Sequence, residues 1–313
     1  MTTEIRIGLP RSSGHYVEVA KELGAPVLIS ANSHWVKPKK MKKPKPEYLG
    51  RRKLIRPGYF RPVCDRLDGM DAALDSGGFV AMTRYGGFRF SIRKYVEFAA
   101  SFPWTHWFQQ DYCVEKEVAP DKDELKTRIH HTVMAYWYTL DERDRLLDQG
   151  YTLSRPVPVL QGRQLEDYLQ SAELHSRLIG GLPPYVGIGS VCRRNSEREL
   201  LSLVVGLARE LPGVRFHLFG VKGAALQLLI DEGPAEAIQS IDSMAWNDAA
   251  RWATPEGESS TNEFRSQFMR DWYRKHTGQA PPGASSSSRR QLSLSATPTP
   301  SEWLDRLRST VSD

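Results

Sequence analysis

Residues 185–233, YVGIGSVCRRNSERELLSLVVGLARELPGVRFHLFGVKGAALQLLIDEG, carry the pattern that decides the fold of this chain. Two short apolar runs, Tyr185–Ile188 and Arg215–Phe219, each lead into small residues and then into a longer amphipathic stretch. The short runs predict buried strands, and apolar residues spaced every three to four positions predict helices. Strands that alternate with helices indicate βαβ units and a parallel sheet.

The same alternation recurs along most of the chain. The predicted strands are Ile5–Leu9, Val27–Ser30, Ala72–Leu74, Trp104–Gln109, Pro156–Leu160, Tyr185–Ile188, Arg215–Phe219 and Ser240–Met244. Eight strands favour an α/β fold of the closed (β/α)8, TIM-like type over an open doubly wound sheet. In such a barrel the chemistry lies at the C-terminal ends of the strands.

The predicted domain organisation has three parts. A (β/α)8 barrel domain spans residues 1–278 and carries a basic insertion at about 36–62. Residues 279–300 are of low complexity and predict a flexible linker. Residues 301–313 predict a short terminal helix that Ser301 caps.

The composition excludes several classes of protein. The 313 residues are 40% hydrophobic and 26% charged, which is typical of a globular chain and excludes collagen and wholesale disorder. No apolar run approaches the ~18–20 residues of a membrane span, and the N-terminus does not resemble a secretory signal. Cys64, Cys113 and Cys192 lie too far apart for a disulfide framework or a zinc ribbon. We therefore expect a soluble, cytoplasmic protein without a membrane partner.

One segment makes the protein basic. Of the 43 Lys and Arg residues, eleven lie between Lys37 and Arg61, against one acid, Glu47. The rest of the chain holds 32 basic and 36 acidic residues. Prolines keep the segment extended, and its charge suits salt-sensitive binding to nucleic-acid phosphates. The alternative is a solvated loop that only keeps the protein soluble, but so concentrated a charge favours a polyanion.

Polar residues and glycines follow the predicted strands. They are Asp75-Ser76-Gly77-Gly78-Phe79, Asp111, Gln161-Gly162, Gly187-Ile188-Gly189, Gly220-Val221-Lys222-Gly223 and Asp242. In a barrel, three carboxylates and an amide would converge on one mouth. Carboxylates gathered there suit acid–base or nucleophilic work, and glycines let a flat ligand approach the backbone.

These strand ends resemble the motifs of the tRNA-guanine transglycosylase family. The matching segments, in the family's order, are Asp75–Phe79 for D-S-G-G-F, Gln161-Gly162 for V-Q-G, Gly187–Gly189 for G-L-A-V-G, Phe216–Gly223 for Y-L-M-G-V-G and Asp242 for the nucleophilic aspartate. The resemblance covers most of residues 5–251. It implies a barrel enzyme that exchanges a base at C1′ of a nucleotide.

Three departures point to one branch of this family. No cysteine follows Cys192, so the family's zinc subdomain is missing or replaced. Ala245-Trp246-Asn247 stands where the family has P-T-R after the nucleophile, and the basic insertion is an addition. These features resemble the DNA-acting, DpdA-like transglycosylases, which swap guanine in phage or bacterial DNA for a 7-deazaguanine. The expected location is the cytoplasm of a bacterium or a phage-infected host cell.

The resemblance implies a role for each motif. Asp242 is the expected nucleophile and Asp75 the general acid/base of a double displacement through a covalent aspartyl intermediate, with no metal and no cofactor. The residues expected to bind the base are Ser76, Asp111, Gln161, Gly187, Ile188 and Gly189. Those expected to bind phosphates are Lys37, Lys39, Lys40, Lys42, Lys43, Arg51, Arg52, Lys53, Arg193 and Arg194. The expected partners are guanine-containing DNA and a free 7-deazaguanine such as preQ0, and the oligomeric state stays open.

Two other functions stay open at this point. One is the same pentosyltransferase reaction on tRNA without the zinc module. The other is a catalytically silent barrel that binds nucleic acid, although the presence of both Asp75 and Asp242 counts against it. Purely structural roles also stay open for single residues, since Asp75 could cap a helix and Asp111 could be a structural hydrogen-bond acceptor.

Overall fold

The computed structural model describes residues 3–36, 58–192, 196–255 and 257–280. The chain divides into two compact units, Met1–Ala245 and Trp246–Asp313. The strands of the described residues all belong to the first unit, whereas the second holds most of α8 (Ala245–Trp252) and all of α9 (Asn262–Thr277). Nearly all of the predicted linker and the whole predicted terminal helix lie outside the described residues.

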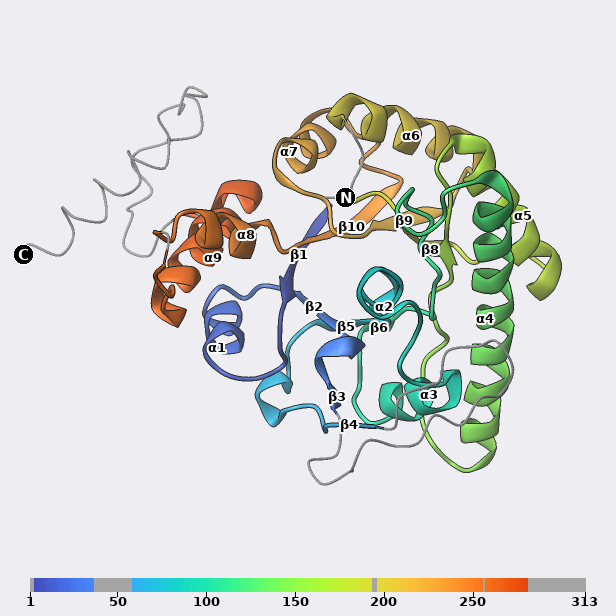
Figure 1. The fold of residues 1–313 in the computed structure, drawn as a ribbon, viewed down its shortest axis with the longest axis horizontal. Helices are drawn as coiled ribbons and strands as arrows, with labels where there is room; N and C mark the ends of the chain where they lie inside the picture. Colours follow the sequence, from blue (N-terminus) through green and yellow to red (C-terminus); the bar gives the residue numbers. More distant parts are fainter. Residues whose placement is uncertain (1–2, 37–57, 193–195, 256, 281–313) are drawn as a thin grey trace, which may run out of the picture. The chain divides into compact units, whose positions relative to one another are not determined.

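Eight parallel strands form one curled sheet in the first unit (Figure 1). In spatial order they run β6-β5-β2-β1-β10-β9-β8-β7. Their bounds are β1 Glu4–Leu9, β2 Val27–Ser30, β5 Ala72–Asp75, β6 His106–Trp107, β7 Val159–Leu160, β8 Tyr185–Ile188, β9 Arg215–Leu218 and β10 Ile238–Ser243. Each overlaps a strand predicted from the sequence, so the α/β fold class is confirmed.

The two edges of this sheet are joined to each other. Phe108, just after β6, forms a parallel bridge with Val157, just before β7. The Gln109 N–H donates to the Val157 carbonyl at 3.1 Å, and the Val157 N–H donates to the Trp107 carbonyl at 2.8 Å. The curl of the sheet therefore brings its first and last strands together.

Helices follow most of the strands. Their bounds in the first unit are α1 His15–Glu22, α2 Gly78–Tyr85, α3 Ile92–Ala99, α4 Lys122–Asp148, α5 Leu165–Ile179, α6 Glu197–Glu210 and α7 Gly223–Glu232. From α3 to α7, each helix packs against the next one along the chain, outside the sheet (Figure 1). Ser91, Asp121 and Ser196 cap α3, α4 and α6 by accepting backbone N–H groups through their side chains, as good N-cap residues do.

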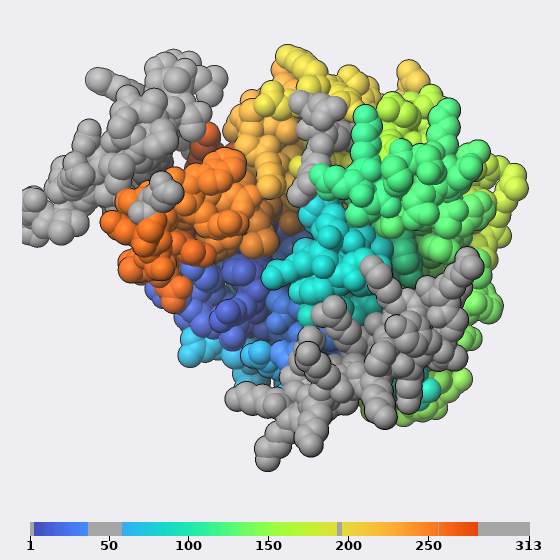
Figure 2. Space-filling model, viewed as in Figure 1, coloured from blue at the N-terminus to red at the C-terminus, as the bar shows by residue number. Residues whose placement is uncertain are grey.

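Side chains fill the inside of the curled sheet. A buried cluster joins Leu28, Ala73, Phe108, Val157 and Val159, which come from four strands or the turns beside them. In the space-filling view, α2 and its neighbours cover the middle of the face that is turned to the viewer (Figure 2). The buried cluster makes the inside of the sheet a packed core.

A buried ion pair network occupies the N-terminal end of the strands. The guanidinium of Arg6 is 1% exposed and lies 2.9 Å from a carboxylate oxygen of Asp71 and 2.6 Å from one of Glu4. Two carboxylates around one cation satisfy a charge that would be costly to bury alone. This leaves the opposite, C-terminal end for the candidate site.

A small antiparallel pair flanks the basic insertion. β3 (Trp35–Val36) pairs with β4 (Tyr59–Phe60), and residues 37–57 between them lie outside the described part. The Phe60 ring stacks on Phe98 with centroids 4.3 Å apart and also packs on Trp35 at 5.0 Å. The pair thus holds the two ends of the insertion side by side.

Candidate active site

The three predicted carboxylates come from the C-terminal ends of neighbouring strands. Asp75 is the last residue of β5, Asp242 is the penultimate residue of β10, and Asp111 follows β6. The negative charges of Asp111 and Asp242 both raise the pKa of Asp75, so both groups lie within electrostatic reach of Asp75. The three carboxylates therefore lie at the C-terminal ends of the strands, where the sequence predicted them.

Asp75 has the pKa of a group that can give and take protons near neutrality. Burial raises the pKa of its carboxyl to about 7, and the charges of Asp111 and Asp242 add to the rise. The polar groups of the Gly77 backbone and the Ser30 side chain act in the other direction and lower the pKa. A carboxyl near half-protonation at neutral pH suits general acid–base work.

This raised pKa carries a prediction for stability. The unfolded chain ionises Asp75 near pH 4, but the folded chain does so only near pH 7, so stability falls as the pH rises through this window. Asp75→Asn removes the buried charge. We expect it to raise the melting temperature at pH 8 and to leave it nearly unchanged at pH 4. Calorimetry at both pH values checks this, with Asp231→Asn on the surface of α7 as control. An equal shift at both pH values would contradict it.

Asp111 is buried and held by two side chains. It is 8% exposed, and its two oxygens accept a hydrogen bond from the Ser76 hydroxyl at 2.8 Å and from the Gln161 amide at 2.6 Å. Burial raises its pKa to about 6, while these two hydrogen bonds oppose the rise. These hydrogen bonds join three of the predicted base-binding residues, Ser76, Asp111 and Gln161, into one preorganised polar unit.

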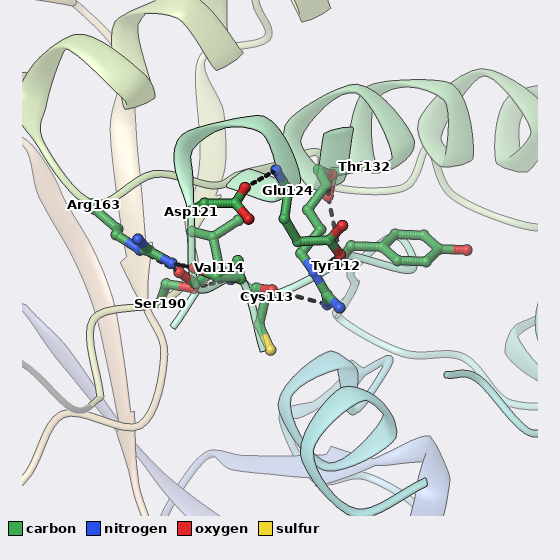
Figure 3. Close-up of polar contacts among 10 residues, drawn as sticks. Tyr112, Cys113, Val114, Asp121, Glu124, Thr132, Arg163 and Ser190 are labelled. Carbon is green, nitrogen blue, oxygen red and sulfur yellow. Dashed lines mark hydrogen bonds and ion pairs between the residues drawn. The ribbon is translucent and has the colours of Figure 1, made fainter. Parts of the chain in front are cut away.

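A further chain of hydrogen bonds fixes Gln161. The Ser190 hydroxyl donates to the Gln161 amide oxygen at 2.7 Å and accepts the Val114 N–H at 2.9 Å. Figure 3 shows Val114 between Ser190 and Arg163, whose guanidinium donates to the Val114 carbonyl at 2.6 Å. Ser190 has a φ of 55°, the one positive φ of a non-glycine residue in the described chain. Such a conformation is held by its surroundings and is often found at functional sites.

Glycines make room for this polar unit. A Cβ on Gly189 would lie 2.2 Å from the Gln161 amide nitrogen, and one on Gly78 would lie 2.5 Å from a carboxylate oxygen of Asp111. On Gly187, a Cβ would lie 2.6 Å from the Phe219 ring. A side chain at these positions would displace a residue of the candidate site.

The backbone of residues 187–189 is already engaged within the protein. The N–H groups of Gly187 and Gly189 donate to the carbonyls of Pro158 and Leu160, and Ile188 is fully buried. These two N–H groups belong to the sheet. The predicted base-binding segment Gly187–Gly189 can therefore contact a ligand by van der Waals packing, but these two N–H groups cannot donate to it.

One oxygen of Asp242 accepts a backbone hydrogen bond and faces a buried histidine. Asp242 is 6% exposed, and its Oδ1 accepts the Gly220 N–H at 2.8 Å and lies 3.4 Å from Nε2 of His217. The sequence alone gives His217 no role, since its contact with Asp242 depends on the pairing of β9 with β10 in the folded sheet.

The other sequence candidates fall in two groups. The predicted phosphate-binding residues Lys37–Lys53, Arg193 and Arg194 lie outside the described residues. Cys113 is buried, and burial raises the pKa of its thiol well above the ordinary value, which does not suit a nucleophile. In the described ranges, no three His, Cys, Asp or Glu side chains are grouped so that they could bind a metal ion, and no helix is long and apolar enough to cross a membrane.

The chain has been compared with known proteins at three levels. A 2,3-dimethylmalate lyase of the PEP mutase/isocitrate lyase superfamily aligns with a TM-score of 0.43 at 13% identity, over 99% of this chain and 93% of that one. No curated protein matches. The family model described as DeoxyPurine in DNA protein A, or DpdA, matches residues 41–281, which is well over half of the chain. The chain therefore belongs to the DpdA family, the branch to which its departures from the tRNA-guanine transglycosylase motifs point.

Proposed function

We propose that this protein is a pentosyltransferase that exchanges guanine in DNA for a free 7-deazaguanine such as preQ0. Asp242 is the nucleophile, Asp75 the general acid/base, and Asp111 with Ser76 and Gln161 binds the base. The observation that carries the proposal is that two carboxyl groups lie at the same strand ends. Asp75 has a pKa of about 7, and Asp242 accepts a hydrogen bond from the Gly220 N–H. Membership of the DpdA family supports DNA as the substrate.

The proposed reaction has two displacements at C1′ of the target nucleotide. In the first, a carboxylate oxygen of Asp242 bonds to C1′, the C1′–N9 bond breaks, and the departing guanine takes the proton of Asp75. In the second, the Asp75 carboxylate removes a proton from the incoming base. N9 of that base then bonds to C1′, and the ester bond to Asp242 breaks. Two inversions return the incoming base in the original configuration.

The polar unit around Asp111 suits the guanine edge. Guanine and its 7-deaza analogues present N–H donors at N1 and at the 2-amino group, and a carboxylate accepts hydrogen bonds from such donors. Asp111 is preorganised by Ser76 and Gln161, so binding needs little rearrangement. Gly187 and Gly189 leave room for the Phe219 ring and the Gln161 amide, since any side chain there would displace them.

The fold supports this reading of the site. We propose that the curled sheet is a complete (β/α)8 barrel, which the bridge between Phe108 and Val157 closes. We also propose that residues 1–278 form the barrel domain.

A duplex substrate would need its guanine flipped out of the stack, which costs a few kcal/mol that pocket contacts must offset.

Gly189→Ala should weaken binding of the incoming base. The added methyl group would lie where the Gln161 amide now stands and would push it away from Asp111. We expect KM for the free base to rise about 10-fold or more, since a buried polar site loses that much when one partner is unpaired. Affinity for DNA should change little. Steady-state kinetics check this, and an unchanged KM would contradict the role given to Gln161.

The basic insertion is the proposed grip on DNA phosphates. Changing Lys39, Lys40, Lys42 and Lys43 to Ser should weaken DNA binding and flatten the slope of log K against log salt by up to about 3–4 units. The matched control changes four exposed lysines elsewhere, Lys21, Lys122, Lys126 and Lys275, to Ser. Binding measured across a salt series checks this. Equal effects of the two variants on DNA binding would mean that the insertion is only a solvated loop.

One experiment tests the proposed function as a whole. The protein is incubated with preQ0 and, separately, duplex DNA, single-stranded DNA or unmodified tRNA, and each sample is digested to nucleosides for mass spectrometry. The expected product is a 7-deazaguanine deoxynucleoside. Product in ribonucleosides would move the activity to tRNA. No product in any sample, with DNA binding intact, would favour a silent barrel.

A further inference from the structure

His217 connects the candidate nucleophile to a buried polar chain that the proposed reaction does not use. The imidazole is fully buried in β9, and its Nδ1 lies 2.7 Å from the Ser240 hydroxyl. That hydroxyl lies 2.8 Å from the Tyr185 hydroxyl. At the other end, Nε2 lies 3.4 Å from Oδ1 of Asp242 and is buried without a hydrogen-bond partner in the described structure.

The neighbours of His217 fix where its nitrogens lie. The Phe108 ring has its centroid 4.8 Å from the imidazole, and the Phe219 ring lies edge-on at 4.5 Å. A half-turn of the imidazole would place a ring carbon opposite the Ser240 hydroxyl in place of Nδ1 and would break that contact. Nδ1 therefore faces Ser240, and Nε2 faces Asp242.

The carboxylate decides which nitrogen carries the proton. A neutral imidazole has one N–H and one lone pair. If Nε2 held the lone pair, it would face the negative charge of Asp242, which is repulsive. With the proton on Nε2, His217 donates toward Asp242, the Ser240 hydroxyl donates to Nδ1, and the Tyr185 hydroxyl donates to Ser240. Nδ1 of His217 and the Ser240 hydroxyl are then both satisfied, and the proton on Nε2 faces the Asp242 carboxylate.

The imidazole acts as a neutral donor. Burial lowers the pKa of His217, and the nearby Asp242 charge only partly offsets this. A neutral donor orients the carboxylate without cancelling its charge, so Asp242 keeps its strength as a nucleophile. The Gly220 N–H donates to Oδ1, and Nε2 of His217 also faces this oxygen at 3.4 Å, which leaves the second oxygen, Oδ2, for the bond to C1′.

We propose that His217 is a positioning residue that orients Asp242 for attack at C1′, and that Tyr185 and Ser240 hold His217 in the tautomer this requires. The inference rests on the proposed function, in which Asp242 is the nucleophile. It predicts that losing the Nε2 donor slows formation of the covalent intermediate while leaving the binding of DNA and base intact.

Three substitutions at His217 test the donor. His217→Phe keeps the ring and removes the donor, and we expect the single-turnover rate of intermediate formation to fall about 100-fold with unchanged KM for the base. His217→Gln places an amide N–H near the position of Nε2, so it should recover part of that rate. His217→Asn places its amide near Nδ1 and should recover less. A wild-type rate for His217→Phe, or equal rates for the Gln and Asn variants, would overturn the proposal.

A matched control separates positioning from packing. His175 is also fully buried, on α5, where its Nδ1 contacts the Ser171 carbonyl. His175→Phe should leave the single-turnover rate unchanged. A loss as large as that of His217→Phe would show that replacing any buried histidine disturbs the site, and it would overturn the proposal.

Nitrogen-15 NMR of the histidines reads the tautomer without any activity. His217 should show the Nε2–H tautomer in the free protein, and Ser240→Ala should shift part of the population to Nδ1–H. A wild-type Nδ1–H tautomer would overturn the inference. Its failure differs from failure of the proposed function: if Asp242→Asn still forms the covalent intermediate, the nucleophile is wrong, whereas an inactive Asp242→Asn with a fully active His217→Phe rejects only the role of His217.

Discussion

Asp242→Asn should lower base exchange by about 10⁴-fold or more, because a nucleophilic step has no substitute once its attacking oxygen is lost. Asn has nearly the same shape, and its amide oxygen can still accept the Gly220 N–H that now holds Oδ1. The fold and the affinity for DNA should therefore survive. The measurement is the rate at which labelled guanine or preQ0 enters DNA, together with a binding isotherm for the same DNA.

A surface carboxylate supplies the control for this change. Asp231 lies exposed on α7 and accepts a hydrogen bond from Gln227, so Asp231→Asn makes the same chemical change away from the site. It should exchange bases at the wild-type rate. Residual exchange by Asp242→Asn within about tenfold of the wild type would mean that another group attacks C1′.

The two half-reactions should depend on pH in opposite directions. Guanine departure needs protonated Asp75, so formation of the covalent intermediate should slow as the pH rises through about 7. Discharge by the incoming base needs the Asp75 carboxylate and should slow as the pH falls. Because the Asp242 charge raises the pKa of Asp75, esterification of Asp242 lowers it. The inflection for discharge should therefore lie below the inflection for formation.

Single-turnover kinetics separate these half-reactions. Formation is followed with DNA alone, and discharge is started by adding preQ0 to the isolated intermediate. Asp75→Asn should slow both steps by about 10²–10⁴-fold and remove both inflections. Inflections that persist in Asp75→Asn, or that run in the same direction in the wild type, would assign the proton transfer to another group.

The order of strands and the carboxylates at their ends could be predicted from the sequence. A buried parallel strand leaves a continuous apolar run, and the residue after it is polar when it faces the mouth, as with Asp75 and Asp111. The resemblance to a known family then gave these residues their expected roles. The family match over residues 41–281 confirms the branch that was expected, and the roles remain proposals.

Other features had no local signal. α2 begins with glycine at Gly78, a poor helix former, because any side chain there would strike Asp111. The strands Trp35–Val36 and Tyr59–Phe60 are two residues each and pair across the insertion, so neither has a period to detect. The proposed role of His217 has no local signal for a similar reason, since it depends on the neighbouring strand that carries Asp242.

The most direct test of the nucleophile is the identity of the covalent intermediate. The protein is mixed with guanine-containing DNA in the absence of a free base, quenched, digested with a protease and a nuclease, and analysed by mass spectrometry. The account predicts a peptide that carries a deoxyribose phosphate remnant on Asp242, and that this peptide disappears when preQ0 is added before the quench. A remnant on any other side chain, or ongoing exchange with no covalent adduct, would contradict the double displacement through Asp242.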